Sequence, residues 1–324
     1  MIRSLLLVSL LVVCRLSQVV AEEPVSINAP KGYSSRAAVM AAVAIGSLKL
    51  VKNDEPLPEG VQEQTDIEYG NVDGHSLLLD LYRPQESSQP TPGLIFIHGG
   101  AWSGGERTVY RYYTTRFAER GFAAATITYR LSGQANFPAA VHDAKCAVRW
   151  MRAHAEKYNI DPDRIAVIGG SAGGHLAMMV GYTENGEMEG NGGHQGVSSR
   201  VGAVVNFYGP VDLTTEEGKG AGAVRDFLGG PFDEMPLQYK AASPISHLDK
   251  DDPPTLIVHG TLDQTVSIQQ ADLLADKLKQ VSVDHSYERL EGWPHTLDAA
   301  ESVNNYCQQV MLAFFQKQLK AAAE

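Results

Sequence analysis

Along most of the chain, short apolar runs alternate with longer segments in which apolar residues recur at helical spacing. The apolar runs predict strands over residues 65–69, 76–82, 93–98, 122–129, 164–168, 201–208, 255–259 and 283–290. The longer segments predict helices over residues 109–120, 137–158, 172–182, 267–280 and 299–320. This alternation favours an α/β fold in which helices cover both faces of a mostly parallel central sheet.

Four other segments complete this outline. Residues 70–74 form a hairpin-type connection between the first two strands, and residues 183–199 are glycine- and acid-rich, typical of a mobile loop. Residues 211–243 are irregular and are predicted to form a small insertion over the site. Residues 22–60 form an N-terminal leader whose alanine-rich part, residues 37–51, has no assigned role. We therefore predict one domain over residues 61–324.

The first 21 residues have the pattern of a secretory signal peptide. Arg3 precedes an apolar run over residues 5–13, and small residues close the segment at positions 19–21. The apolar run is too short to span a bilayer, so no stable membrane insertion is expected. We predict export to the periplasm or the medium; a retained anchor and lipidation at Cys14 are the alternatives.

Composition narrows the class of protein. Hydrophobic residues make up 44% of the 324 residues and charged residues 20%, as in a globular enzyme. The formal net charge of −11 disfavours binding to nucleic acid or to anionic lipid, since both are themselves negatively charged.

The stretch Gly169-Gly170-Ser171-Ala172-Gly173 follows a β-branched run and precedes an apolar helical segment. It fits G-x-S-x-G, the strand-to-helix turn that exposes a nucleophilic serine. Small neighbours permit the strained turn, and the N-terminus of the helix offers N–H groups to a developing oxyanion. Ser171 is therefore the candidate nucleophile; an ordinary glycine-rich or phosphate-binding turn is the alternative.

A second motif, His98-Gly99-Gly100-Ala101-Trp102, directly follows a predicted buried strand. Loops of this type supply oxyanion-hole N–H groups in lipases and esterases. The predicted donors are the backbone N–H groups of Gly100, Ala101 and Ala172. His98 is expected to hold the loop through a backbone contact, and Trp102 to contact substrate.

The remaining catalytic candidates follow later strands. Asp263 comes after the strand that ends at His259, where its carboxylate can orient an imidazole, and Asp212 is the rival acid. His295 lies in a Gly-Trp-Pro-His loop after the last strand and is the candidate base, whereas His285 falls inside that strand. Ser171, Asp263 and His295 then follow the order nucleophile, acid, histidine.

Metal and nucleotide sites find no support in the sequence. It contains no H-x-x-x-H or C-x-x-C spacing, and the glycine-rich turn lacks the lysine of a phosphate-binding loop. No metal and no cofactor are expected.

Together, HGGAW, GGSAGGHLA, HGTLDQTV and GWPH resemble the α/β-hydrolase superfamily, and more narrowly the serine esterases of the BD-FAE-like and hormone-sensitive-lipase-related groups. Residues 65–320 carry the resemblance. It implies an α/β-hydrolase fold in which Cys146 and Cys307 lie on opposite faces of the sheet and stay unpaired. Two departures are Ala101 in place of a third glycine and the absence of a large N-terminal cap.

The resemblance implies a carboxylesterase that uses a Ser-Asp-His triad and an acyl-enzyme intermediate. Without a large cap, small or carbohydrate-linked acyl esters are the expected substrates. The alternatives are an arylformamidase-like amide hydrolase, a prolyl-oligopeptidase-type peptidase and a non-catalytic hydrolase-fold binding module.

Overall fold

The computed structural model describes residues 28–184 and 186–320, so the predicted signal peptide lies outside the described residues. The strands are β1 (Val61–Val72), β2 (His75–Pro84), β3 (Thr91–Ile97), β4 (Ala123–Ile127), β5 (Ile160–Gly170), β6 (Ala203–Phe207), β7 (Thr255–Gly260) and β8 (His285–Leu290). The α-helices are α1 (Arg36–Ala44), α2 (Arg111–Glu119), α3 (Ala139–Ala153), α4 (Ala155–Tyr158), α5 (Ala172–Tyr182), α6 (Glu216–Gly220), α7 (Gly222–Leu228), α8 (Pro236–Ala241), α9 (Ile268–Gln280) and α10 (Glu301–Gln318). Three 3-10 turns, η1 (Arg107–Tyr110), η2 (Pro244–Ser246) and η3 (Leu297–Ala299), complete the described elements.

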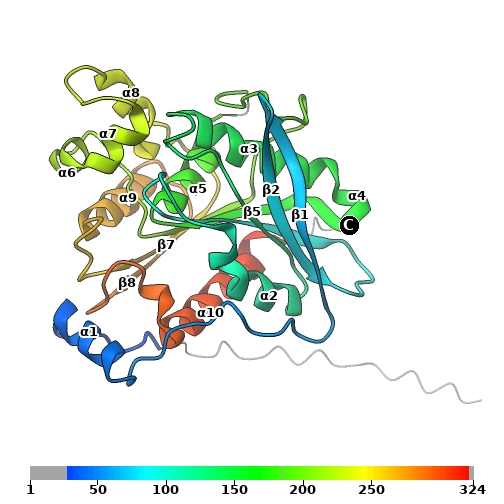
Figure 1. The fold of residues 1–324 in the computed structure, drawn as a ribbon, viewed down its shortest axis with the longest axis horizontal. Coiled ribbons are helices and arrows are strands. Elements are labelled where there is room, and N and C mark those ends of the chain that lie inside the picture. Colours follow the sequence, from blue (N-terminus) through cyan, green and yellow to red (C-terminus); the bar gives the residue numbers. More distant parts are fainter. Residues whose placement is uncertain (1–27, 185, 321–324) are drawn as a thin grey trace, which may run out of the picture.

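The strands form one eight-stranded sheet in the order β1-β2-β4-β3-β5-β6-β7-β8 (Figure 1). The pairs β1–β2 and β2–β4 are antiparallel, and all pairs from β4 to β8 are parallel. The carboxyl ends of the parallel strands therefore meet at one edge of the sheet, where ligand sites of such folds lie. The predicted mostly parallel sheet is confirmed.

Two hydrophobic cores lie on opposite faces of the sheet. Along β3, Ile95 and Ile97 belong to the core with α3, α5 and α9, whereas Leu94 and Phe96 belong to the core with α2 and α10. This period of two places helices on both faces, as predicted. Cys146 and Cys307 are buried and unpaired in different cores, so the expected separation of the two thiols is confirmed.

The first hairpin differs from its prediction. Its strands extend over residues 61–72 and 75–84, and the connection is only Asp73-Gly74, both at positive φ. Asp-Gly is the usual two-residue hairpin turn, so the turn residues were present within the predicted five-residue connection. The polar residues of edge strand β1, largely exposed, hid its length.

Two predicted helices are divided in the structure. The segment 137–158 forms α3 and the short α4, separated at His154, and the segment 109–120 forms η1 followed by α2. Apolar periodicity continues through both breaks, so it does not report the change of backbone angles.

The insertion predicted at residues 211–243 contains α6, α7 and α8, the yellow-green helices of Figure 1. Phe227 of α7 stacks on Trp102, with ring centroids 4.5 Å apart. The Asn136 side-chain amide also donates to Asp226 O at 2.8 Å. The insertion therefore packs over the loop that follows β3, at the edge where the parallel strands end.

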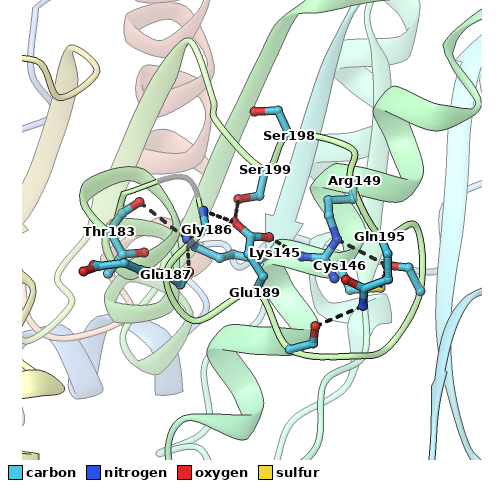
Figure 2. Close-up of polar contacts among 12 residues, drawn as sticks. Lys145, Cys146, Arg149, Thr183, Gly186, Glu187, Glu189, Gln195, Ser198 and Ser199 are labelled. Atoms are coloured by element: carbon cyan, nitrogen blue, oxygen red, sulfur yellow. Dashed lines mark hydrogen bonds and ion pairs between the residues drawn. The ribbon is translucent and has the colours of Figure 1, made fainter.

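The loop over residues 183–199 is anchored to α3 instead of standing free (Figure 2). The Lys145 ammonium group donates to the backbone carbonyls of Glu184 at 3.1 Å and Glu187 at 2.6 Å. The carboxylate of Glu189 accepts from Arg149, and from Ser199 Oγ at 2.6 Å. The glycine-rich composition suggested a mobile loop, but the buried cations of α3 hold it.

No helix in residues 28–184 or 186–320 has the length and apolar character needed to cross a bilayer.

We expect Glu189→Gln to lower the free energy of unfolding by about 3 kcal/mol at pH 7, because the buried Arg149 and Lys145 then lose the carboxylate with which both form ion pairs. Burial alone would raise the pKa of Glu189, but Ser199, Lys145 and Arg149 lower it. The carboxylate therefore stabilises the protein above the usual pKa of a glutamate and loses this effect as the pH falls through its lowered value.

Urea unfolding at several pH values measures this difference. It should be largest at neutral pH and shrink in acid. The control Glu216→Gln removes an exposed ion pair with Lys219 and should cost less than about 0.5 kcal/mol. Equal losses in the two variants would contradict the role given to Glu189.

Candidate active site

Ser171 stands at the turn between β5 and α5. Its φ and ψ are 56° and −123°, outside the regions that L-residues usually adopt, and its N–H donates to Phe207 O at 2.8 Å. Such a conformation costs about 1–3 kcal/mol and persists only when the surroundings impose it. Here the neighbouring strand β6 fixes the backbone.

Close backbone packing explains the glycines around Ser171. A Cβ on Gly173 would lie 1.9 Å from Ile97 O, and one on Gly169 would lie 2.1 Å from Gly173 O. Real side chains cannot occupy either position. The G-x-S-x-G pattern therefore reflects direct contact between the start of α5 and the ends of β3 and β5.

The structure brings the three predicted triad residues together. Ser171 Oγ lies 3.0 Å from His295 Nε2, and His295 Nδ1 lies 2.6 Å from Asp263 Oδ2. Because a carboxylate only accepts, Nδ1–H donates to Asp263 and Nε2 accepts from the Ser171 hydroxyl. In this tautomer the imidazole can take the proton of Ser171.

Asp263 is held in a fixed, buried position after β7. Its Oδ1 accepts from the N–H groups of Thr265 at 2.8 Å and Val266 at 3.0 Å. Burial alone would raise its pKa, but hydrogen bonds from His259 and His295 hold the pKa well below the usual range of a carboxyl. Asp263 therefore stays ionised beside the imidazole.

The rival acid, Asp212, has a different partner. Its Oδ1 accepts from the N–H of Thr214 at 2.8 Å and from the Thr214 hydroxyl at 2.6 Å. It closes a local turn at the start of the insertion, and the structure does not bring it to His295. The His285 imidazole donates from Nδ1 to Val283 O at 3.0 Å, in its own strand region.

The loop after β3 lies directly against the turn at Ser171. A Cβ on Gly99 would be 2.7 Å from Gly170 O, and Ala101 lines a small cavity together with Ser171 and Ala172. Within the described chain, the N–H groups of Gly100, Ala101 and Ala172 donate to no other protein group. They are available to an oxygen of a bound molecule. Ala101 adopts φ +54°, the left-handed conformation that a third glycine would adopt more easily.

His98 has the structural role expected of it. Its Nδ1–H donates to Gly99 O at 2.7 Å, and its ring stacks on Tyr129 with centroids 4.5 Å apart. Burial lowers its pKa, so the imidazole is neutral. His98 fixes the loop and lies outside the triad.

Trp102 is buried, with 3% of its surface exposed. Its Nε1–H donates to His175 Nδ1 at 3.2 Å, so this group is not free for a substrate. His175 Nε2–H in turn donates to Ala242 O at 2.7 Å, and burial lowers the pKa of His175 to about 4. Any substrate contact of Trp102 is therefore made by its ring, which lines the small cavity.

Three residues at the site had no assigned role in the sequence. His259 Nε2 lies 3.1 Å from Asp263 Oδ2 and 2.9 Å from Val266 O, so its N–H supports the acid. The Tyr208 ring lies 4.7 Å from the His295 ring, and its hydroxyl donates to Asp298, whose pKa is raised by burial. In the sequence, His259 is marked only as the last residue of the predicted strand before the turn to Asp263. No motif or spacing marks Tyr208 or Asp298.

Three cavities surround the triad. A central cavity of about 620 Å³ is lined by both Ser171 and His295. A small cavity of about 100 Å³ is lined by Ser171 but not by His295, and a groove of about 420 Å³ is lined by His295 but not by Ser171. In the described residues, no group of three or more His, Cys, Asp or Glu side chains is placed to bind a metal ion.

Comparison with known proteins identifies the family of this chain. The profile of the BD-FAE family matches residues 79–278. Esterase LipC of Mycobacterium tuberculosis is 32% identical over 255 residues, which are 76% of this chain and 63% of LipC. The chain therefore spans less than two thirds of the length of this curated relative.

Solved structures give the same fold. A truncated carbohydrate esterase from gut microbiota superposes with a TM-score of 0.70 at 29% identity, covering 82% of this chain and 99% of that one. An esterase of Thermogutta terrifontis, solved with butyrate, gives a TM-score of 0.69 at 28% identity, covering 82% and 97%. The predicted α/β-hydrolase fold is confirmed. Because the family profile covers more than half of the chain, the protein belongs to the BD-FAE family of α/β-hydrolases.

Proposed function

We propose that the protein is a serine carboxylic-ester hydrolase that acts through an acyl-enzyme on Ser171. One observation carries this proposal. The Ser171 hydroxyl, the His295 imidazole and the Asp263 carboxylate form a continuous chain of hydrogen bonds of 3.0 and 2.6 Å. LipC and both structural neighbours are named as esterases, which supports it.

In the first half of the reaction, His295 Nε2 removes the proton of Ser171 Oγ as this oxygen attacks the ester carbonyl. The N–H groups of Gly100, Ala101 and Ala172 stabilise the negative oxygen of the tetrahedral intermediate. Collapse of the intermediate breaks the bond to the alcohol oxygen, which takes its proton from the imidazolium. The acyl group remains on Ser171.

In the second half, water replaces the alcohol. His295 takes one proton from the water as its oxygen attacks the acyl carbonyl, and then returns this proton to Ser171 Oγ. The carboxylic acid leaves. Asp263 stabilises the imidazolium in both halves without itself being protonated.

The cavities support a short acyl group. The small cavity of about 100 Å³ touches the nucleophile but not the base, so it suits the acyl chain and excludes a long one. Its apolar wall includes Trp102, Leu213, Val224 and Val266. The Thermogutta neighbour was solved with butyrate, which is a short acid. The carbohydrate esterase neighbour supports sugar-linked esters as substrates, in addition to small alkyl esters.

We expect Ser171→Ala to lower kcat for p-nitrophenyl acetate at least about a thousandfold, because no other oxygen occupies the nucleophile position. The circular dichroism spectrum and Tm should stay close to those of the wild type. The wild type, quenched in acid during turnover, should carry one acetyl group on Ser171 by mass spectrometry. Retained turnover in the variant would refute the mechanism.

We expect Asp263→Asn to lower kcat about ten-thousandfold, because an amide favours the wrong tautomer of His295. Asp212 lines the small cavity but hydrogen-bonds to Thr214 and not to His295, so the matched variant Asp212→Asn should lower kcat less than tenfold. Steady-state kinetics on the same ester compare the two. A larger loss in Asp212→Asn would reassign the acid.

We expect Val224→Ala to shift the preferred acyl chain toward longer acids, because it enlarges the small cavity. The ratio of kcat/KM for p-nitrophenyl hexanoate to that for the acetate should rise about tenfold. The control Val283→Ala is equally buried but lines none of the three cavities. An unchanged ratio in Val224→Ala would place the acyl chain elsewhere.

A further inference from the structure

The N-terminal segment over residues 28–53 packs against the loop that carries His295. The Trp293 indole N–H donates to Pro30 O at 3.0 Å, and the Tyr33 N–H donates to Gly292 O at 2.9 Å. The Tyr33 and Trp293 rings meet edge to face with centroids 5.6 Å apart. A Cβ on Gly32 would lie 2.1 Å from Glu291 O, so this contact requires glycine. The start of the segment is therefore fixed just before His295.

The end of the segment is fixed just after the same loop. Leu50 forms an antiparallel bridge with Ala300. The backbone N–H of Val51 donates to Ala299 O at 2.9 Å, and that of Glu301 donates to Lys49 O at 2.9 Å. Helix α1, dark blue in Figure 1, lies between these two attachments and next to the orange segment that follows β8. The His295 loop and α1 thus form one packed unit.

Between α1 and the His295 loop lies the groove of about 420 Å³. The apolar side chains that line it are Val39, Met40, Val43, Leu48, Leu50, Leu262, Trp293, Pro294 and Leu297. Arg36 and Gln264 are among its polar lining residues. The groove adjoins the central cavity, because His295, Thr296 and Leu50 line both.

The apolar surface of this groove faces solvent. Met40 is 60% exposed and Leu50 is 47% exposed, and both line the groove. Exposed apolar surface that adjoins a reactive site is typical of a ligand-binding surface. Ile45 is even more exposed, at 78%, but lines none of the three cavities around the triad and provides an internal comparison.

We propose that this groove binds the alcohol part of the ester and selects an apolar alcohol, alkyl or aryl, over an extended saccharide. The inference rests on the proposed function. The leaving alcohol receives its proton from His295 Nε2, so its oxygen lies beside His295, which lines both the central cavity and the groove. Its aliphatic wall can cover methylene or aryl groups but offers few partners to a chain of sugar hydroxyls.

Acetate esters test this assignment, because they keep the acyl group constant. The substrates are ethyl acetate, hexyl acetate and a xylo-oligosaccharide that carries one acetyl group, and the readout is kcat/KM from acid release in a pH-stat. In the wild type, hexyl acetate should exceed both ethyl acetate and the acetylated sugar at least fivefold. The double variant Met40→Gln/Leu50→Gln should lower the hexyl-to-ethyl ratio about tenfold.

Two controls make the outcomes distinct. Ile45→Gln makes the same kind of change on the same segment and should leave the hexyl-to-ethyl ratio unchanged. Both altered residues of the double variant are exposed, so its Tm should match that of the wild type. A ratio that is unchanged in the double variant, or a wild type that prefers the acetylated sugar, would overturn the groove assignment alone. Failure of the wild type to cleave any of these acetates would overturn the proposed function.

Discussion

The left-handed backbone of Ser171 is the constraint on which the rest of the site depends. With φ at 56°, the residue turns the chain sharply from β5 into α5 and raises its hydroxyl above the carboxyl edge of the sheet. The turn is possible only because Gly173 meets Ile97 O without a side chain between them. The same contact brings the end of β3, and hence the loop from His98 to Trp102, next to the serine. One backbone contact therefore positions both Ser171, the proposed nucleophile, and the three N–H groups proposed to bind the oxyanion.

A second layer of buried polar contacts holds these loops in register. Trp102, His175 and Ala242 form a chain of donors and acceptors that links the loop after β3, the helix after Ser171 and the end of α8. Since this chain requires His175 to be neutral and in one tautomer, it couples the insertion to the oxyanion loop through a single imidazole. His259 acts in a comparable way on Asp263. Each side of the proposed triad is thus supported by a histidine that takes no part in proton transfer.

Local sequence was enough to predict the parts of the site that depend on backbone chemistry. Only glycine fits the close backbone contacts around Ser171, and polar side chains in loops at strand ends mark candidate catalytic positions. Ser171, Asp263 and His295 could therefore be selected from the sequence, and the structure places them together. Tyr208 and Asp298 could not, because their contact joins two distant segments and neither sits in a motif. The burial of Trp102 could not be predicted either, because Phe227, which stacks on it, comes from the distant insertion. Helix breaks and the length of β1 were also beyond a pattern that records only apolar spacing.

The N-terminal segment shows most clearly what local patterns cannot give. In the sequence, its alanine-rich stretch is a possible helix without an assigned role. Only the structure shows that the segment packs on the His295 loop, through contacts of Pro30 and Tyr33 with Trp293 and Gly292. The family profile matches residues 79–278, so it includes neither the N-terminal segment over residues 28–53 nor His295. The two segments that pack on each other thus both lie outside the region that carries Ser171 and Asp263. This division fits the proposed mechanism, in which the matched region supplies Ser171, Asp263 and the loop after β3, while the two segments outside it hold His295 and shape the groove beside it.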